Sequence, residues 1–282
     1  VSDYISRPFD AKVVYQRVFN TIKLYAKQRR LITLVTDQVY EKEKNNRIMV
    51  SILSQIVEFR NGESGLHVEH INKLSGMLLE RLVQKTDKYH LTWTDQYLIT
   101  VASALHDIGK IGIDEKILNK PGKLTPEEFE LMKMHTMIGA SMLKRLEIYK
   151  EERLVQIACE ICRWHHERYD GSGYPDGLKG EEIPIAAQVV SIVDVYDALT
   201  SPRVYKKAYS HEKAMQMILT GECGVFQPLL LDCFYDIQEE VRKATQEKSE
   251  KEGKISGFEL TDLKETLKNS HLIGDLKPEK NH

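Results

Sequence analysis

Residues 165–184, HHERYDGSGYPDGLKGEEIP, contain the strongest loop signal in the chain and decide how the rest is interpreted. Four glycines and two prolines fall in the fifteen positions from 170 to 184, out of 16 Gly and 8 Pro in all 282 residues. Clusters of Gly and Pro interrupt helices and strands. Elsewhere such clusters are missing and apolar residues recur at helical spacing, so the sequence predicts an all-α fold with one long loop.

The helical segments are indicated by apolar residues at steps of three and four. They cover 11–60, 66–84, 95–106, 187–200, 210–219 and 228–245. The first predicts either one long helix or two stacked helices broken near residues 44–47. A further helix begins at Thr125, because Thr is a good N-cap, Pro126 suits the first helical position and Glu128 completes a capping box.

Composition excludes several classes of protein. There are 40 basic and 42 acidic residues, a formal net charge of −2, which excludes a strongly basic protein that coats a nucleic-acid polymer. No apolar run approaches the roughly 18 residues of a membrane span. Four cysteines are too few for a disulfide scaffold and predict a reducing compartment, the cytoplasm. Cys159 and Cys162 form a C-x-x-C pair, but no second pair follows, which favours buried thiols over structural zinc.

Eight side chains combine into a candidate metal centre. They offer five imidazoles and three carboxylates: Glu63, His67, His106, Asp107, His135, His165, His166 and Asp194. Mixed nitrogen and oxygen donors suit first-row ions such as Fe, Mn or Zn. Eight donors exceed the needs of one ion and predict two or three bridged ions. Such a centre lowers the pKa of its bridging water and stabilises in-line attack at phosphorus.

Each of these residues also has a simpler interpretation. A single helical histidine is more often an ordinary core or surface residue, and Glu63 with His67 would form an i,i+4 surface pair. Asp194 is harder to dismiss, because burying a carboxylate in an apolar helix without a partner is costly. Asp197, one turn later, could cap, pair or support a ligand, and the pattern does not choose among these roles.

Taken together, the motifs resemble the HD-GYP branch of the HD metal-dependent phosphohydrolases, over residues 60–245. The matching stretches are HDIGK at 106–110, NKPGKLT at 119–125, HHERYDGSGYP at 165–175, GEEIP at 180–184 and DVYDALTS at 194–201. The resemblance implies an all-helical HD-GYP bundle that cleaves cyclic dinucleotides, chiefly cyclic di-GMP. It implies two or three divalent ions, with Fe or Mn favoured and Zn, Ni or Mg as alternatives.

The resemblance also implies roles for individual residues. The eight candidate ligands fall on the family's ligand positions, with Glu63 the ligand of a third ion. Asp107 would bridge two ions and help to hold the attacking hydroxide. Lys110 would act in catalysis on the phosphate side, and Arg203 and Lys206 would bind substrate phosphate with it. Tyr174, in the glycine-rich loop, would support the pocket and contact partner proteins.

Four positions depart from the family's pattern. His70 stands where Arg is frequent, Thr136 and Val204 stand where Pro is frequent, and Gln227 replaces an Asp N-cap. None of them removes a ligand. They leave substrate affinity and base preference open.

The N-terminal residues resemble a different protein. The stretch DYISRPF at 3–9, followed by an amphipathic helix, is similar to the last strand and helix of a response-regulator receiver domain. This implies a receiver remnant over 1–30, a helical connector able to dimerise over 31–60, the catalytic domain over 61–245 and a polar tail over 246–282. The rest of the receiver, with its cognate histidine kinase as partner, would then lie upstream.

The sequence thus predicts the output domain of a two-component response regulator. It would hydrolyse cyclic di-GMP to linear pGpG and, after a second cut, GMP, with diguanylate cyclase domains and a second copy of the chain as further partners. One alternative substrate is another cyclic dinucleotide, such as the mixed GMP–AMP form. A second alternative is a non-catalytic module that binds the dinucleotide or docks on a partner, which the complete ligand set disfavours.

Overall fold

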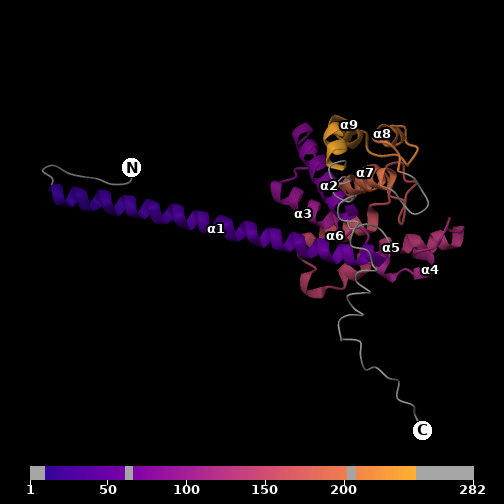
Figure 1. Cartoon of the computed structure of the whole chain (residues 1–282), viewed down its shortest axis with the longest axis horizontal. Helices are drawn as coiled ribbons and strands as arrows, with labels where there is room; N and C mark the ends of the chain where they lie inside the picture. The colour runs from indigo at the N-terminus through magenta and orange to yellow at the C-terminus, as the bar shows by residue number, and fades with distance from the viewer. Residues whose placement is uncertain (1–9, 61–65, 202–207, 246–282) are drawn as a thin grey trace, which may run out of the picture. The chain divides into compact units, whose positions relative to one another are not determined.

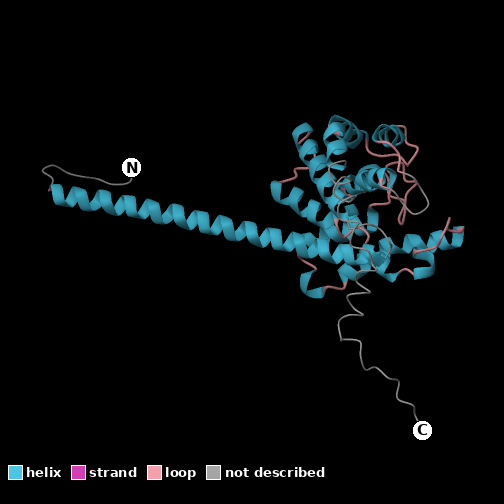
Figure 2. Cartoon of the chain, in the orientation of Figure 1, coloured by secondary structure: helices cyan, strands magenta, loops and turns pink. Residues whose placement is uncertain are grey.

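The computed structural model describes residues 10–60, 66–201 and 208–245. Every regular element in these ranges is a helix (Figure 2), which confirms the all-α class. The predicted strand near residues 3–6 and the candidate site residues Glu63, Arg203 and Lys206 lie outside them. The main helices are α1 (Ala11–Arg60), α2 (Leu66–Lys85), α3 (Trp93–Ser103), α5 (Pro126–Lys144), α6 (Arg153–Trp164), α7 (Ile185–Thr200), α8 (His211–Leu219) and α9 (Pro228–Asp236). Short elements are η1 (Ile108–Gly112), α4 (Glu115–Leu118), η2 (Glu147–Tyr149) and η3 (Gly180–Glu182).

Helix α1 is continuous over its 50 residues, so the alternative with a break near residues 44–47 is wrong. The chain divides into two compact units after Leu53. In the first unit most of the apolar side chains of α1 are exposed. In the second unit the last turns of α1 supply three buried residues, Ser54, Val57 and Glu58. The packing of the second unit therefore begins before residue 61, while the four-part domain division stays a prediction.

The core of the second unit is built around α2 and α7. On α2, Ile71, Leu74 and Leu78 follow steps of three and four and are fully buried, as expected for the apolar stripe of a packed helix. Helix α7 is buried on nearly every side, which explains its uniformly apolar sequence. Helix α2 packs against α3, α7 and α9, while α6 packs against α3, α5 and α7, and these helices form one bundle (Figure 1).

Helix ends agree with the predicted caps but not always with the predicted lengths. Thr125 caps α5 with the expected capping box, and the Ser210 side chain caps α8. Helix α3 stops at Ser103, short of the predicted end at 106, and α9 stops at Asp236, where a turn precedes residues 238–245. The early end of α3 matters most, because it releases His106 and Asp107 from helical geometry.

Two further predictions concern cysteines and membranes. All four cysteines are free, and the buried Cys162 thiol donates to the Leu105 carbonyl at 3.0 Å. Cys162 is buried as predicted, whereas Cys159 is only partly buried, and both thiols are free. No helix in the described ranges is both long enough and apolar enough to cross a membrane.

Candidate metal centre

Asp107 lies in a tight turn between α3 and η1. The backbone N–H groups of Leu105 and His106 donate back to the end of α3 at 2.9 and 3.3 Å, and η1 then runs against α5. Gly109 permits this contact, because a Cβ at that position would collide with the backbone carbonyl of His135. The close approach brings Oδ1 of Asp107 within 3.2 Å of Nε2 of His135.

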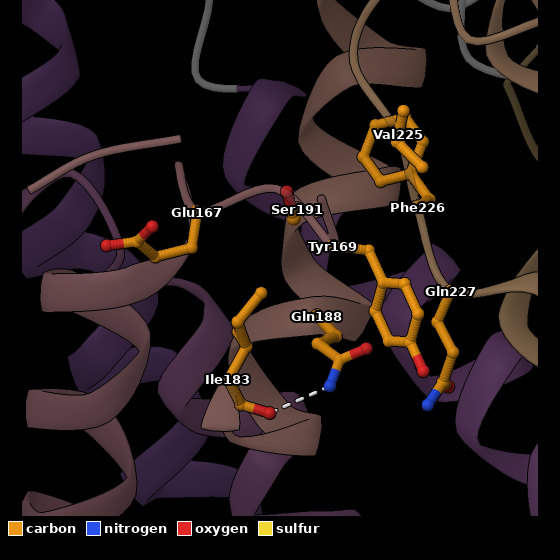
Figure 3. Close-up of a pocket in the computed structure, with 8 residues that line it drawn as sticks. All are labelled: Glu167, Tyr169, Ile183, Gln188, Ser191, Val225, Phe226 and Gln227. Atoms are coloured by element: carbon orange, nitrogen blue, oxygen red, sulfur yellow. Dashed lines mark hydrogen bonds between the residues drawn. The ribbon is translucent and has the colours of Figure 1, made fainter. Parts of the chain in front are cut away.

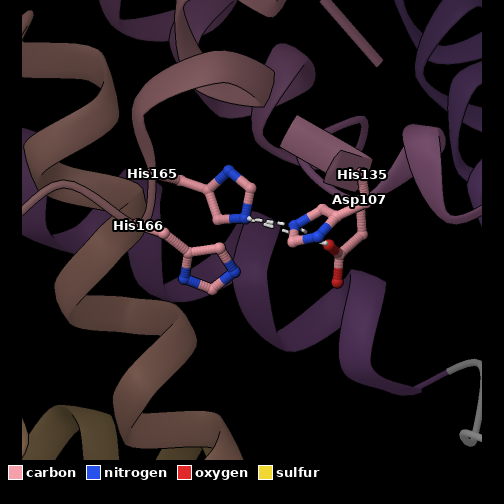
Figure 4. A group of neighbouring side chains, drawn as sticks. All are labelled: Asp107, His135, His165 and His166. Atoms are coloured by element: carbon pink, nitrogen blue, oxygen red, sulfur yellow. Dashed lines mark hydrogen bonds and ion pairs between the residues drawn. The ribbon is translucent and has the colours of Figure 1, made fainter. Parts of the chain in front are cut away.

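One set of donors is rich in imidazole, and we call it the imidazole-rich group. It consists of Asp107, His135 on α5, and His165 and His166 after α6, with ligand atoms within 4.8 Å of one another. Figure 4 shows the four side chains converging. His135 Nε2 and His165 Nε2 are 3.4 Å apart, and His165 Nε2 is 3.8 Å from Asp107 Oδ1.

The second set, the carboxylate-flanked group, lies on the other side of Asp107. It contains His67 on α2, His106, Asp107, Asp194 on α7 and Glu58 on α1. His67 Nε2 is 3.3 Å from His106 Nε2, and each of these nitrogens is 3.8 Å from Asp194 Oδ1. Asp107 Oδ2 is 3.3 Å from His106 Nε2, whereas Oδ1 faces the imidazole-rich group. Asp107 is therefore placed to be shared by both groups.

The hydrogen bonds behind the rings define which nitrogen carries the proton. Nδ1 of His106, His135 and His165 each lies within 2.9 Å of a backbone carbonyl, and a carbonyl can only accept. Nδ1 is therefore the protonated nitrogen in the neutral ring, and Nε2 keeps a bare lone pair. Facing lone pairs such as those of His135 and His165 repel each other unless a cation lies between them. The donor set thus fits a metal ion.

Asp197 positions His67 of the carboxylate-flanked group and also binds His70. Its carboxylate oxygens accept from Nδ1 of His67 at 2.7 Å and from Nδ1 of His70 at 2.6 Å. The carboxyl is buried, but these bonds keep its pKa below the ordinary range. The role that the sequence left open is therefore pairing, and it orients Nε2 of His67 toward Asp194.

The two groups differ in the protonation they favour. Burial lowers the pKa of His67, but the hydrogen bond to Asp197 and the nearby carboxylates outweigh it and raise the pKa to about 10. Burial lowers the pKa of His165 to about 3, and the neighbouring imidazoles of His106 and His135 lower it further. Burial likewise lowers the pKa of His166 well below its usual value. The three imidazoles of the imidazole-rich group are therefore neutral, whereas His67 holds a proton when no metal does.

Lys110 is paired with the shared carboxylate. Its Nζ is 2.7 Å from Oδ2 of Asp107 across the first turn of η1. Burial opposes ionisation of Asp107, but Lys110 and the neighbouring imidazoles outweigh it and keep the pKa well below the ordinary range. Asp107 is therefore an anion at neutral pH, as a bridging ligand must be.

Glu167 organises the glycine-rich loop. The buried carboxylate accepts backbone N–H bonds from Asp176, Gly177 and Leu178 at 2.7 to 3.1 Å. The ring of Tyr174 in this loop packs on His166, with centroids 4.7 Å apart. The loop therefore forms one wall of the imidazole-rich group.

Beneath the loop is a small pocket that none of the candidate ligands lines (Figure 3). There the side-chain amide of Gln188 donates to the Ile183 carbonyl at 2.7 Å. The residues that line this pocket therefore pack beneath the loop and support it, and they do not extend the candidate metal centre.

Seven of the eight candidate ligands lie within the described ranges, and the structure brings all seven together around Asp107. Glu63 lies outside those ranges, as do Arg203 and Lys206. Sequence reasoning missed Glu58 and Glu167. No local pattern singles out Glu58, because its apolar neighbours Ile56 and Phe59 are exposed while Glu58 itself is buried.

The fold and the site define a helical protein with a cluster of histidines and aspartates that could hold metal ions. The family model described as HD domain matches residues 52–222, and the chain belongs to the HD domain family. A probable cyclic di-GMP phosphodiesterase from Vibrio cholerae is 37% identical over 82% of this chain and 55% of its own length.

Two more curated relatives have related names. A cyclic di-GMP phosphodiesterase response regulator from Xanthomonas campestris is 34% identical over 82% of this chain and 60% of its own. A 3'3'-cGAMP-specific phosphodiesterase from Vibrio cholerae is 36% identical over 67% of this chain and 34% of its own. The chain thus spans little more than half the length of the first two relatives.

Proposed function

We propose that this chain is an HD-GYP phosphodiesterase that hydrolyses cyclic di-GMP in a metal-dependent reaction. The observation that carries the proposal is Asp107, a buried anion with one oxygen toward each of two groups of inward-facing imidazoles. One shared carboxylate between two donor sets is the arrangement of a centre with two ions. The proposal of cyclic di-GMP as the substrate is supported by the names of the relatives.

The proposed ligands are the eight residues identified in the sequence. His135, His165 and His166 would hold one ion with Asp107, and His67, His106 and Asp194 would hold a second with it; Glu63 would bind a third. Divalent ions, with Fe or Mn favoured, polarise phosphate oxygens and lower the pKa of water when bound. Their identity and number are part of the proposal.

Residues of the chain itself bind and orient the substrate in this proposal. The Nζ of Lys110 lies at the edge of the site, where the side chain is 15% exposed, and can contact a substrate phosphate while it stays near Asp107. Arg203 and Lys206 would hold phosphate from the segment after α7. Cationic donors at these places favour an anionic transition state.

The test is anaerobic purification, metal quantification and product analysis. The metal-loaded protein is expected to convert cyclic di-GMP to linear pGpG, and more slowly to GMP. Binding of cyclic di-GMP without hydrolysis in protein loaded with Mn²⁺ or Fe²⁺ would instead establish a non-catalytic module.

A second candidate substrate is the mixed GMP–AMP dinucleotide. It is favoured by the relative named as 3'3'-cGAMP-specific, which is nearly as similar to this chain as the others. Measuring kcat/KM for both dinucleotides decides which of them is the preferred substrate. A larger value for the mixed form would replace cyclic di-GMP as the substrate.

The proposal extends to the chain's cellular context. Residues 1–30 would be the end of a receiver domain that a histidine kinase phosphorylates, 31–60 the connector, 61–245 the catalytic domain and 246–282 a polar tail. One relative carries the name response regulator. Four free cysteines support a reducing compartment, the cytoplasm. The glycine-rich loop would be the surface for diguanylate cyclase domains.

We further propose that α1 pairs with its copy in a homodimer. Val18, Tyr25, Ile32 and Val39 stand at seven-residue spacing and are each 50 to 57% exposed. Asn46 occupies the next position of this row, and one polar residue in such a row sets the register of a coiled coil. Light scattering is expected to give a dimer, and Ile32→Lys a monomer.

A further inference from the structure

Glu58 is a buried carboxylate at the metal centre that comes from an element outside the recognised motifs. It lies two residues before the end of α1, and only 2% of it is exposed. Its Oε1 is 3.8 Å from Nε2 of His67, the nitrogen that faces the centre. An ionised carboxylate at this depth is costly unless a cation accompanies it.

The distances around His67 match those between ligands of one ion. With metal–ligand bonds of about 2.0–2.2 Å, two ligand atoms lie about 3 Å apart at a right angle and about 4.2 Å apart when opposite. From His67 Nε2, the distances are 3.3 Å to His106 Nε2, 3.8 Å to Asp194 Oδ1 and 3.8 Å to Glu58 Oε1. All three lie within this interval.

The position of Glu58 is held by its own helix end. Nη1 of Arg60 donates to the carbonyls of Lys110 and Ile111 at 3.3 and 2.6 Å, and Nη2 donates to Ile113 at 2.8 Å. Asn119 donates in return to the Arg60 carbonyl at 3.0 Å. The last turn of α1 is therefore fastened to η1, the element that follows Asp107.

From this placement we propose that Glu58 is a ligand of the ion held by His67, His106 and Asp194. The inference rests on the proposed metal-dependent function and adds a ligand from α1 to it. It differs from the role that the family resemblance implies for Glu63, which lies five residues later and outside the described ranges. It also makes the end of α1 part of the metal centre.

The test measures metal binding directly. Equilibrium dialysis with Mn²⁺ is carried out on the full chain, its Glu58→Gln variant and Glu80→Gln, a matched change at an exposed position of α2. Glu58→Gln is expected to weaken Mn²⁺ binding at the carboxylate-flanked group at least tenfold. Binding at the imidazole-rich group, and both affinities of Glu80→Gln, should equal those of the wild type. Wild-type affinity for both ions in Glu58→Gln would overturn the inference and leave the proposed function standing.

A second variant keeps the test decisive if Glu58→Gln does not fold. Glu58→Cys places a thiolate at the same position, and Co²⁺ bound to a thiolate shows a charge-transfer absorption band that carboxylate and imidazole ligands do not give. The band is expected in Glu58→Cys and not in Glu80→Cys. A spectrum equal to that of Glu80→Cys would overturn the inference. A wild-type chain that binds no Mn²⁺ at all would overturn the proposed function as well.

Discussion

The two donor groups on either side of Asp107 differ in the protonation of their buried histidines when no metal is bound. In the imidazole-rich group, burial lowers the pKa of His165 to about 3, so that this imidazole is neutral without a metal. In the carboxylate-flanked group, Asp197 and its neighbours raise the pKa of His67 to about 10, so that a proton occupies the place of an ion. A metal ion therefore competes with a proton only at the carboxylate-flanked group.

This contrast predicts that metal binding depends on pH differently at the two groups. An ion entering the imidazole-rich group displaces no proton at neutral pH, whereas an ion entering the other group must displace the one on His67. Against this, the second group offers more negative charge to a divalent ion. The two sites should therefore differ in pH dependence more than in affinity at high pH.

The largest effect is expected from changing the residue that both groups share. His106→Ala combined with Asp107→Ala removes a ligand from each side, and we expect both ions to be lost and hydrolysis to fall by about 10³-fold or more. Metal analysis and product assays measure this, and circular dichroism checks that the chain stays helical. Asp87→Asn, at an exposed position, is the control. Retained activity in the double variant would refute the site.

A smaller and one-sided effect is expected from Asp197→Asn. The substitution leaves His67 in place but removes the anion that orients it, and loss of such a partner typically weakens a metal by about 10- to 100-fold. Only Mn²⁺ binding at the carboxylate-flanked group should weaken. Equilibrium dialysis of Asp197→Asn, with Asp87→Asn as the control variant, measures this. Equal weakening of both ions would mean that the two groups act as one.

The sequence predicted which residues gather around Asp107 better than it predicted their geometry. His106 and His135 could be chosen from motif and spacing, since these depend on residue type alone. The exit of His106 from α3 could not, because it depends on the contact of Gly109 with α5, which brings together residues 26 positions apart. Asp197 and Glu58 act through partners on other helices, so no local pattern distinguishes their roles. Burial in a tertiary contact is what separates them from surface carboxylates.

A substitution outside both donor groups is expected to change substrate binding but not metal binding. Arg203→Ala is expected to raise the KM for cyclic di-GMP about tenfold, because one charge-assisted contact to phosphate is lost. Metal content should stay at the wild-type value in the same preparation. An unchanged KM would remove Arg203 from the proposed substrate contacts.

The smallest effect tests the proton on His67 directly, through the stability of metal-free protein. The folded-state pKa of about 10 lies above the ordinary value of 6.5, so the stability that His67 contributes is complete below pH 6.5 and is lost as the pH rises toward 10. His165, with its pKa lowered to about 3, lowers stability only below about pH 6.5. Of the two donor groups, only the carboxylate-flanked one is therefore expected to lower the Tm between pH 7 and 9.

Thermal unfolding of chelator-treated protein at pH 7, 8 and 9 measures this decline. His67→Asn should flatten it, whereas His90→Asn, at an exposed loop position, should keep the wild-type slope. Saturating Mn²⁺ should also flatten it, because the ion takes the place of the proton on His67. If His67→Asn and His90→Asn lost Tm equally across this range, the proton would not reside on His67. The contrast between the two groups would then come from their ligands alone.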